Sequence, residues 1–250
     1  MLDGMYVKSI GIRDGIDQEE SYIARLPAVM HLRSMGGLVL RKKVTFFVGE
    51  NGTGKSTLLE ALAVSVGFNA EGGSRKYRFQ TKATESLLHR YLTVSRTGYQ
   101  KDGFFLRAES FYNAASYLDL LDEIPAGGPR VMDSYGGGSL HCQSHGESFM
   151  ALVENRFGEN GLYILDEPEA ALSPVRQMSL LSEFHRLVRA GSQLLIATHS
   201  PILMAYPDSE IYELREDGIY LTPYEQTSHY QLMRRFLNHP QKMLQDLLDE

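Results

Sequence analysis

Short apolar runs alternate with amphipathic stretches along this chain. The runs 44–48, 162–165 and 193–197 are mostly apolar, which is typical of strands buried on both faces of a parallel sheet. Residues 174–189 instead repeat apolar positions at helical spacing, with Gly191 just beyond the end. This alternation predicts an α/β fold whose mostly parallel sheet is flanked by helices.

The segments around these strands have more mixed patterns. Residues 6–12 alternate in part and predict an N-terminal antiparallel edge strand, and 86–124 predict two or three helical pieces. Apolar positions around Gly218 predict a hairpin. We therefore expect a single domain, with a core of 1–83 and 148–225 that includes the antiparallel β part, a small helical subdomain at 84–147, and a polar C-terminal helix at 226–250.

A glycine-rich loop follows the first buried strand. Residues 49–57 fill the pattern G-x-x-x-x-G-K-[ST], in which backbone N–H groups surround a phosphate at a helix N-terminus. In this pattern Lys55 reaches the β- and γ-phosphates and the Ser56 hydroxyl holds Mg²⁺. The loop predicts a site for ATP and Mg²⁺, with binding residues Asn51, Gly52, Thr53, Gly54, Lys55, Ser56 and Thr57.

Ionisable residues follow the other two buried strands. Asp166 and Glu167 come directly after 162–165, and His199 comes shortly after 193–197. Because the carboxyl ends of parallel strands meet at one edge of a sheet, we expect these side chains near the bound phosphates. We assign Asp166 to the metal, commonly through water, Glu167 to the attacking water as general base, and His199 to the γ-phosphate. A lone histidine at a strand end is otherwise often only a packing residue.

The segment 144–158 predicts a helix with Ser144 as N-cap and Glu147 completing a capping box. Its N-terminus could also hold a phosphate. His141, Cys142 and His145 suggest a zinc site instead, but no second ligand pair stands nearby.

Composition excludes several classes. The chain of 250 residues is 43% hydrophobic, so it is not disordered, and its single cysteine excludes a disulfide framework and fits a cytoplasmic protein. A net charge of −6 argues against a broadly basic nucleic-acid surface. Basic and aromatic residues alternate over 75–82, a segment that could contact nucleic acid, contact only the bound nucleotide, or form a solvated loop. No run is long enough to span a membrane, so we expect no direct membrane insertion.

Taken together, these motifs resemble the ABC-type ATPases, and within them the non-transporter kind related to chromosome-structure and recombination-repair ATPases. The matching segments are 49–57 (Walker A), Gln80 (Q-loop), 144–147 (signature), 162–168 (Walker B), 170–173 (D-loop) and His199 (switch histidine). The resemblance implies ATP-dependent homodimers in which Ser144 and the Gly146 amide of one copy bind the γ-phosphate held by the other. It also implies that Gln80 contributes to the metal site.

Some positions depart from the pattern of the transporter subunits. Glu147 ends the signature, no leucine precedes Ser144, and Ser173 replaces the usual aspartate of the D-loop. The first two departures favour the non-transporter branch. Residues 80–144 are too few for the long coiled coil of the chromosome-structure proteins.

Three functions fit this pattern. The first is an ATP-hydrolysing, dimerising switch in a DNA-linked or stress or defence process, with an effector protein as partner. The second is the nucleotide-binding subunit of an ABC transporter. The third, a nucleotide or small-molecule kinase, shares the phosphate loop, but Asp166, Glu167 and His199 suit water as the acceptor. An aromatic side chain, Tyr6 or Tyr22, could stack on the purine, although both could simply pack.

Overall fold

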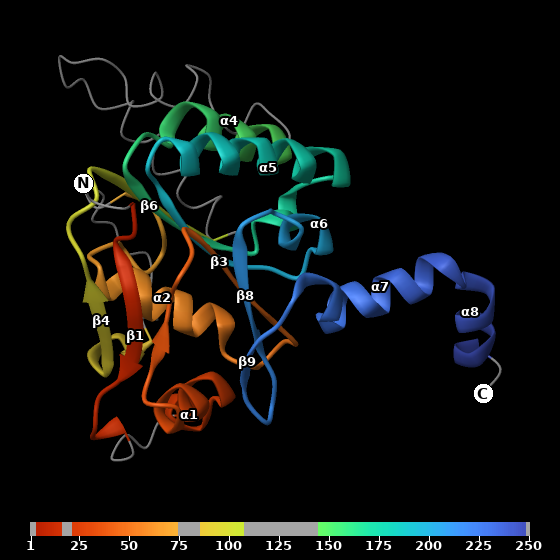
Figure 1. Cartoon of the computed structure of the whole chain (residues 1–250), viewed down its shortest axis with the longest axis horizontal. Helices are drawn as coiled ribbons and strands as arrows, with labels where there is room; N and C mark the ends of the chain where they lie inside the picture. The colour runs from red at the N-terminus through yellow and green to blue at the C-terminus, as the bar shows by residue number, and fades with distance from the viewer. Residues whose placement is uncertain (1–3, 17–21, 75–85, 108–144, 249–250) are drawn as a thin grey trace.

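A six-stranded sheet forms the centre of the protein (Figure 1). The computed structural model describes residues 4–16, 22–74, 86–107 and 145–248. In the order β5-β6-β7-β3-β8-β9, the first five strands are parallel and β9 is antiparallel to β8. The bounds are β3 (Val44–Gly49), β5 (Asp102–Arg107), β6 (Gly161–Asp166), β7 (Gln193–Ala197), β8 (Ser209–Leu214) and β9 (Ile219–Leu221).

A second, antiparallel sheet of three strands lies beside the first in the order β2-β1-β4. Its strands are β1 (Val7–Ile12), β2 (Leu38–Val39) and β4 (Leu92–Arg96). The predicted fold class, a mostly parallel sheet with an N-terminal antiparallel part, is confirmed. The prediction that the first strand is an edge strand is wrong, because β1 is hydrogen-bonded on both sides.

Helices cover both faces of the central sheet (Figure 1). Strand alternation sends Phe46 into the core shared with α4, α5 and α6, and Phe47 into the core shared with α1, α2 and the small sheet. Both rings are fully buried, so each face of the sheet has an apolar core of its own. The helices are α1 (Pro27–Ser34), α2 (Lys55–Ser65), α4 (His145–Arg156), α5 (Pro174–Arg189) and α6 (Pro201–Met204), with short 3-10 helices η2 (Tyr22–Arg25), η3 (Leu87–Arg90), η6 (Pro168–Ala171) and η7 (Tyr224–Gln226).

Residues 86–107 differ from the prediction of a helical segment. Only η3 is helical, and the chain continues as β4 in the small sheet and β5 at the edge of the large one. Apolar residues such as Leu88 and Leu92 fit helical spacing, but both are buried against the small sheet and α2, where tertiary packing outweighs local preference. Residues 84–85 and 108–144 of the predicted subdomain lie outside the described residues, so the subdomain remains a prediction there.

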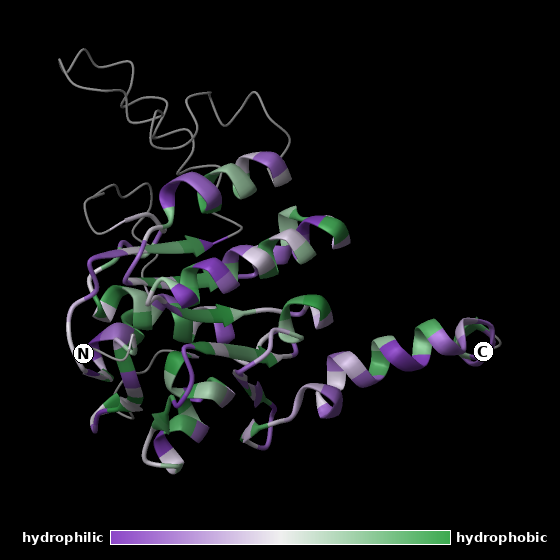
Figure 2. Cartoon of the chain, turned by 45° about the horizontal axis from the view of Figure 1, so that its top comes forward, coloured by the Kyte–Doolittle hydropathy of each residue, from purple (hydrophilic) through white to green (hydrophobic). Residues whose placement is uncertain are grey.

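The C-terminal segment forms two helices that extend away from the body (Figures 1 and 2). We call α7 (Ser228–Asn238) and α8 (Pro240–Leu248) the arm. The sequence predicts one helix here, but α7 ends at Asn238 and a second helix begins at Pro240. A proline has no backbone N–H with which to continue α7. The arm carries exposed apolar side chains, among them Leu232, Leu237, Leu244 and Leu247. None of the described helices is both long and apolar enough to cross a membrane.

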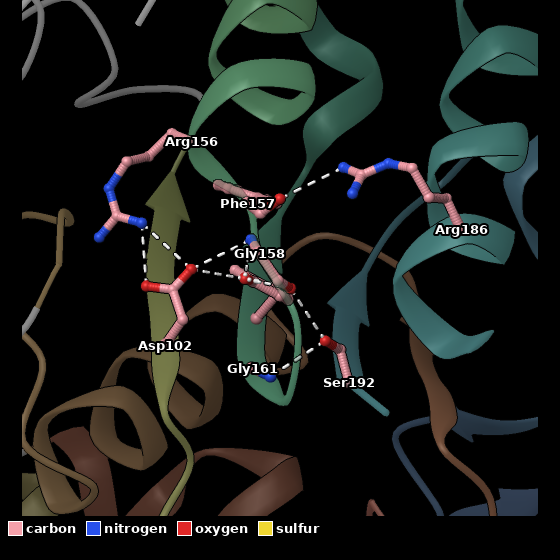
Figure 3. Close-up of polar contacts among 8 residues, drawn as sticks. Asp102, Arg156, Phe157, Gly158, Gly161, Arg186 and Ser192 are labelled. Atoms are coloured by element: carbon pink, nitrogen blue, oxygen red, sulfur yellow. Dashed lines mark hydrogen bonds and ion pairs between the residues drawn. The ribbon is translucent and has the colours of Figure 1, made fainter. Parts of the chain in front are cut away.

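A polar cluster joins the strands at the edge of the sheet where β5, β6 and β7 begin (Figure 3). The Asp102 carboxylate accepts hydrogen bonds from Arg156 Nη1 at 2.9 Å and from the Tyr163 hydroxyl at 2.8 Å. The Ser192 hydroxyl donates to the Gly158 carbonyl at 3.2 Å and accepts from the Gly161 amide at 3.0 Å. Burial opposes ionisation of Asp102, but the bonds from Arg156 and Tyr163 outweigh it and lower the pKa of its carboxyl group.

We predict that Asp102→Asn lowers the free energy of unfolding by about 1–3 kcal/mol at pH 7, because Arg156 loses its charged partner in a mostly buried site. Since the pKa of Asp102 is lowered in the folded state, its contribution is complete above the unfolded value of about 4 and falls as the pH drops through the folded value. Urea unfolding of both proteins from pH 7 to pH 3 measures the difference.

The matched control is Asp208→Asn, the same change in an exposed ion pair with Lys42, for which we expect little effect. A difference between wild type and Asp102→Asn that stays constant down to pH 3 would contradict the ionic contribution.

Candidate functional site

The predicted phosphate loop, acids and histidine meet at one edge of the sheet. β3 and β6 both pair with β7, so Ala197 lies opposite Phe47 on one side and Asp166 on the other. The loops that leave these strands therefore start side by side, as the sequence predicts. The edge holds the loop 49–54, the acidic segment after β6 and His199.

The loop is shaped by its glycines and closed by Lys55. Gly49 has φ 143°, and a Cβ there would lie 2.2 Å from the Leu214 carbonyl oxygen, so no other residue fits. Lys55 is buried, and its Nζ donates to the carbonyl oxygens of Gly49 at 2.7 Å and Glu50 at 2.9 Å. Burial lowers the pKa of Lys55, while the carboxylates of Glu167 and Asp166 act in the opposite direction.

A cavity of about 300 Å³ lies beside the loop. Its lining combines the loop 49–53 with the turn after β8 and the first residues of α7, including His229. Pockets of this size suit small ligands, and this one borders the backbone amides of the loop.

Ser56 and Asp166 form the candidate metal site. The Ser56 hydroxyl donates to Asp166 Oδ1 at 3.0 Å, and Asp166 is buried. Two neighbouring ligands of an octahedral Mg²⁺, each at about 2.1 Å, lie about 3 Å apart, so these two oxygens fit the ion. Arg107 Nε lies 3.7 Å from Asp166 Oδ2, and Arg107 Nη1 pairs with Glu60 at 2.7 Å, so Arg107 restrains the acid from behind.

In the described part of the chain, no three His, Cys, Asp or Glu side chains gather as a metal cluster. A magnesium ion here would complete its shell with phosphate oxygens and water, which is its usual mode of binding.

Glu167 turns away from Asp166 toward His199. It adopts the left-handed conformation at φ 53°, which is costly for a residue with a side chain and is concentrated at functional sites. Its side chain is 39% exposed, and its Oε1 lies 3.5 Å from His199 Nε2. Neighbouring acids thus have different environments, one buried beside Ser56 and one open to water.

The structure brings Lys55, Ser56, Asp166, Glu167 and His199 together at the sheet edge that also holds the rest of the phosphate loop. Ser144 and Gln80 are outside the described residues, as are the basic segment 75–82 and Cys142. Gly146 is buried at the start of α4, where a Cβ would lie 2.7 Å from the Ala171 carbonyl oxygen. Packing against η6 therefore accounts for this glycine within one chain, and its phosphate-binding role remains a prediction.

The two candidate purine-stacking tyrosines differ in position. Tyr6 is 3% exposed, and its hydroxyl donates to the Gly191 carbonyl, which precedes β7 at the opposite edge of the sheet. It therefore packs in the core and cannot stack on a nucleotide in the loop. Tyr22 is 65% exposed and remains a candidate.

Three residues at this edge received no role from the sequence. Glu169 accepts a hydrogen bond from the His199 backbone N–H at 2.6 Å, and burial raises the pKa of its carboxyl group. His229 approaches His199 from α7. Glu169 could have been suspected from its place after the buried strand. Arg107 was hidden by the helical prediction for its segment, and His229 had no sequence signal at all.

Two family models match parts of the chain. Residues 36–102 match a family described as "AAA domain", and residues 139–205 match one described as "AAA domain, putative AbiEii toxin, Type IV TA system". A curated relative from Bacillus anthracis, described as "Putative ABC transporter ATP-binding protein", is 26% identical, and the match covers 67% of this chain. It covers only 32% of that longer relative.

Solved structures with similar folds include ATP-binding cassettes. The cassette MJ1267 of an ABC transporter is 18% identical with a TM-score of 0.50, and the match covers 94% of this chain and 96% of that one. The structure of cbiO1 from Clostridium perfringens, part of the ABC transporter complex cbiONQ, is 15% identical with a TM-score of 0.49, over 98% and 100% of the two chains. At 18% identity, the similarity to MJ1267 concerns the fold alone.

We predict that Asp166→Asn removes most of the gain in ATP affinity that Mg²⁺ provides, because the amide lacks the negative charge that faces the ion. The loss should be roughly 10–100-fold, and binding in EDTA should not weaken. Titration of ATP by calorimetry, with Mg²⁺ and with EDTA, measures both affinities.

Asp208→Asn, an exposed substitution of the same kind, is the control and should bind as wild type does. Equal losses with and without Mg²⁺ in Asp166→Asn would contradict a metal role for this residue.

Proposed function

We propose, from the premise that this chain is an ATP-binding ABC-type P-loop ATPase domain, that two copies close around two Mg²⁺-bound ATP molecules. Hydrolysis then reopens the dimer, so that the protein acts as a nucleotide-driven switch on a partner protein. One observation carries the proposal. At a single sheet edge, Asp166 contacts Ser56 at 3.0 Å while the neighbouring Glu167 lies 3.5 Å from His199. Asp166 thus lies where it could bind the metal ion, and Glu167 lies where it could contact the attacking water.

The chemistry follows from these positions. Mg²⁺, held by Ser56 and Asp166, would offset the charge on the β- and γ-phosphate oxygens. Lys55 binds the same phosphates from the loop. Glu167 accepts a proton from the attacking water as the new oxygen–phosphorus bond forms and the bond to the β-phosphate oxygen breaks, releasing ADP and phosphate. His199 Nε2 donates a hydrogen bond to a γ-phosphate oxygen and so senses whether that group is present.

The position of α4 supports a site shared between two copies. The described lining of the cavity beside the loop includes no residue of α4. The first turn of α4 is instead held against its own chain, where Glu147 pairs with Arg176 at 2.9 Å and a Cβ on Gly146 would lie 2.7 Å from the Ala171 carbonyl oxygen. We propose that this turn, with Ser144 before it, presents amides to the γ-phosphate of a second copy.

The process in which the switch acts is proposed from the comparisons. The family matched by 139–205 carries a description that names a toxin–antitoxin system, which favours a stress or defence process over transport. A DNA-linked process is kept with it because of the basic and aromatic residues at 75–82, which lie in a segment that could contact nucleic acid.

The second candidate is the nucleotide-binding subunit of an ABC transporter. It is favoured by the description of the Bacillus anthracis relative as an ABC transporter ATP-binding protein. Recovery of the native protein with a membrane-spanning subunit would favour this candidate, and recovery as a dimer without one would favour the switch.

We predict that Glu167→Gln leaves ATP binding intact, slows hydrolysis about 100-fold or more and accumulates a dimer in ATP, because the amide cannot take the proton from water. Gel filtration with ATP and phosphate release measure the two effects. Glu159→Gln, an exposed change elsewhere, serves as control. A variant that stays monomeric with normal turnover would refute the assignment of Glu167.

We also predict that two inactive variants restore activity when mixed. Lys55→Ala removes the lysine that binds the phosphates, and Ser144→Arg blocks the proposed signature contact. Neither homodimer therefore contains a complete ATP site. A mixed dimer contains one intact loop facing one intact signature, and phosphate release should recover in the mixture. No recovery, with both variants folded and Ser144→Arg still binding ATP, would exclude the shared site.

A further inference from the structure

Two imidazole rings meet beside the candidate catalytic acid. His199 follows β7 and His229 is the second residue of α7, and His199 Nδ1 lies 3.0 Å from His229 Nε2. The ring centroids are 5.1 Å apart, with the planes inclined by 61°. The geometry points to His229 as a positioning residue that keeps the proton of neutral His199 on Nε2, the nitrogen directed at Glu167 and the proposed γ-phosphate position. This inference rests on the proposed function.

Two neutral imidazole rings can form a hydrogen bond in two arrangements. A neutral imidazole has one N–H and one acceptor nitrogen, so a bond between two such rings needs the proton on one of the facing atoms. If His229 Nε2 donates, His199 carries its own proton on Nε2. If His199 Nδ1 donates, its Nε2 presents a lone pair instead.

The surroundings of His199 select the first arrangement. Its Nε2 lies 3.5 Å from a carboxylate oxygen of Glu167, which an N–H faces favourably and a lone pair does not. The backbone N–H of His199 donates to Glu169 Oε1, which fixes the backbone from which the ring extends. Donation from His229 and attraction by Glu167 thus favour the same tautomer, the one that can donate to a phosphate oxygen.

The neutral form of both rings is favoured near pH 7, so the inference concerns which nitrogen carries a proton and not the charge of a ring. Burial lowers the pKa of His199 and of His229. Lys55 lowers both further, and His229 also lowers the pKa of His199. Acidic groups oppose these effects, with Glu167 and Glu50 acting on His199 and Glu50 and Glu213 acting on His229. Glu169 also faces His199 through the backbone bond.

The base of the arm holds His229 in place. The backbone N–H of Ser228 donates to Glu213 Oε1 at 2.9 Å, which fixes the first turn of α7 to β8. Thr227 caps the helix and is fully buried. His229 itself lines the cavity beside the phosphate loop. Its ring is therefore built into the site, although its helix otherwise extends into solvent.

The test compares two substitutions of His229. His229→Phe keeps a ring but removes both nitrogens, and we expect kcat for ATP hydrolysis to fall about tenfold or more with little change in KM. His229→Gln keeps an N–H donor that can reach His199 Nδ1, and it should recover most of the rate. His239→Phe, on an exposed residue after the same helix, is the control. Equal losses in the Phe and Gln variants would reduce His229 to packing and overturn the proposal.

A second measurement does not depend on activity. Nitrogen-15 NMR of histidine-labelled wild-type chain, without nucleotide, should show His199 protonated on Nε2, and His229→Phe should shift this population toward Nδ1. A wild-type His199 protonated on Nδ1 would overturn the proposal even if the variants fail to fold. If wild type does not hydrolyse ATP, the proposed function fails, whereas the NMR result still decides which ring donates.

Discussion

The register of the parallel sheet is the constraint on which the site depends. Ala197 of β7 lies opposite both Phe47 of β3 and Asp166 of β6, so three chain segments far apart in sequence end at the same level. A shift of one residue in either pairing would turn Asp166 to the other face of the sheet and break its 3.0 Å contact with Ser56. Two apolar cores, one on each face, stabilise this register, because a shift would move fully buried side chains such as Phe46 and Phe47 out of the positions in which they are packed.

The charged side chains at this edge of the sheet each lie next to a polar or oppositely charged partner. Lys55 is buried beneath the loop and bonded to its carbonyl oxygens. Asp166 contacts Ser56 through Oδ1 and lies near Arg107 through Oδ2, and the guanidinium group of Arg107 also pairs with Glu60. Buried ions need such partners because desolvation of an isolated charge is costly. Of the two neighbouring acids, Asp166 is buried and Glu167 remains accessible to water.

The first turn of the arm contacts the site, while the rest of the arm extends into solvent. α7 begins at Ser228, which is bonded to Glu213 of β8, and then leaves the body with its apolar side chains exposed. His229 lies at this junction and contacts His199. A single contact between two histidine rings therefore joins His199, the residue that we propose binds the γ-phosphate, to a helix that is exposed to solvent.

The chain itself determined much of this protein. The buried strands, the phosphate loop and the places of Asp166, Glu167 and His199 follow from local patterns, because period-two and helical spacing and a motif such as G-x-x-x-x-G-K-[ST] depend on neighbours in sequence. Only the tertiary structure decided that β1 lies inside its sheet, that Leu92 belongs to a strand, and that His229 reaches the site. Those outcomes depend on which distant surfaces pack together, and contacts between residues 30 or more positions apart leave no periodic trace in the sequence.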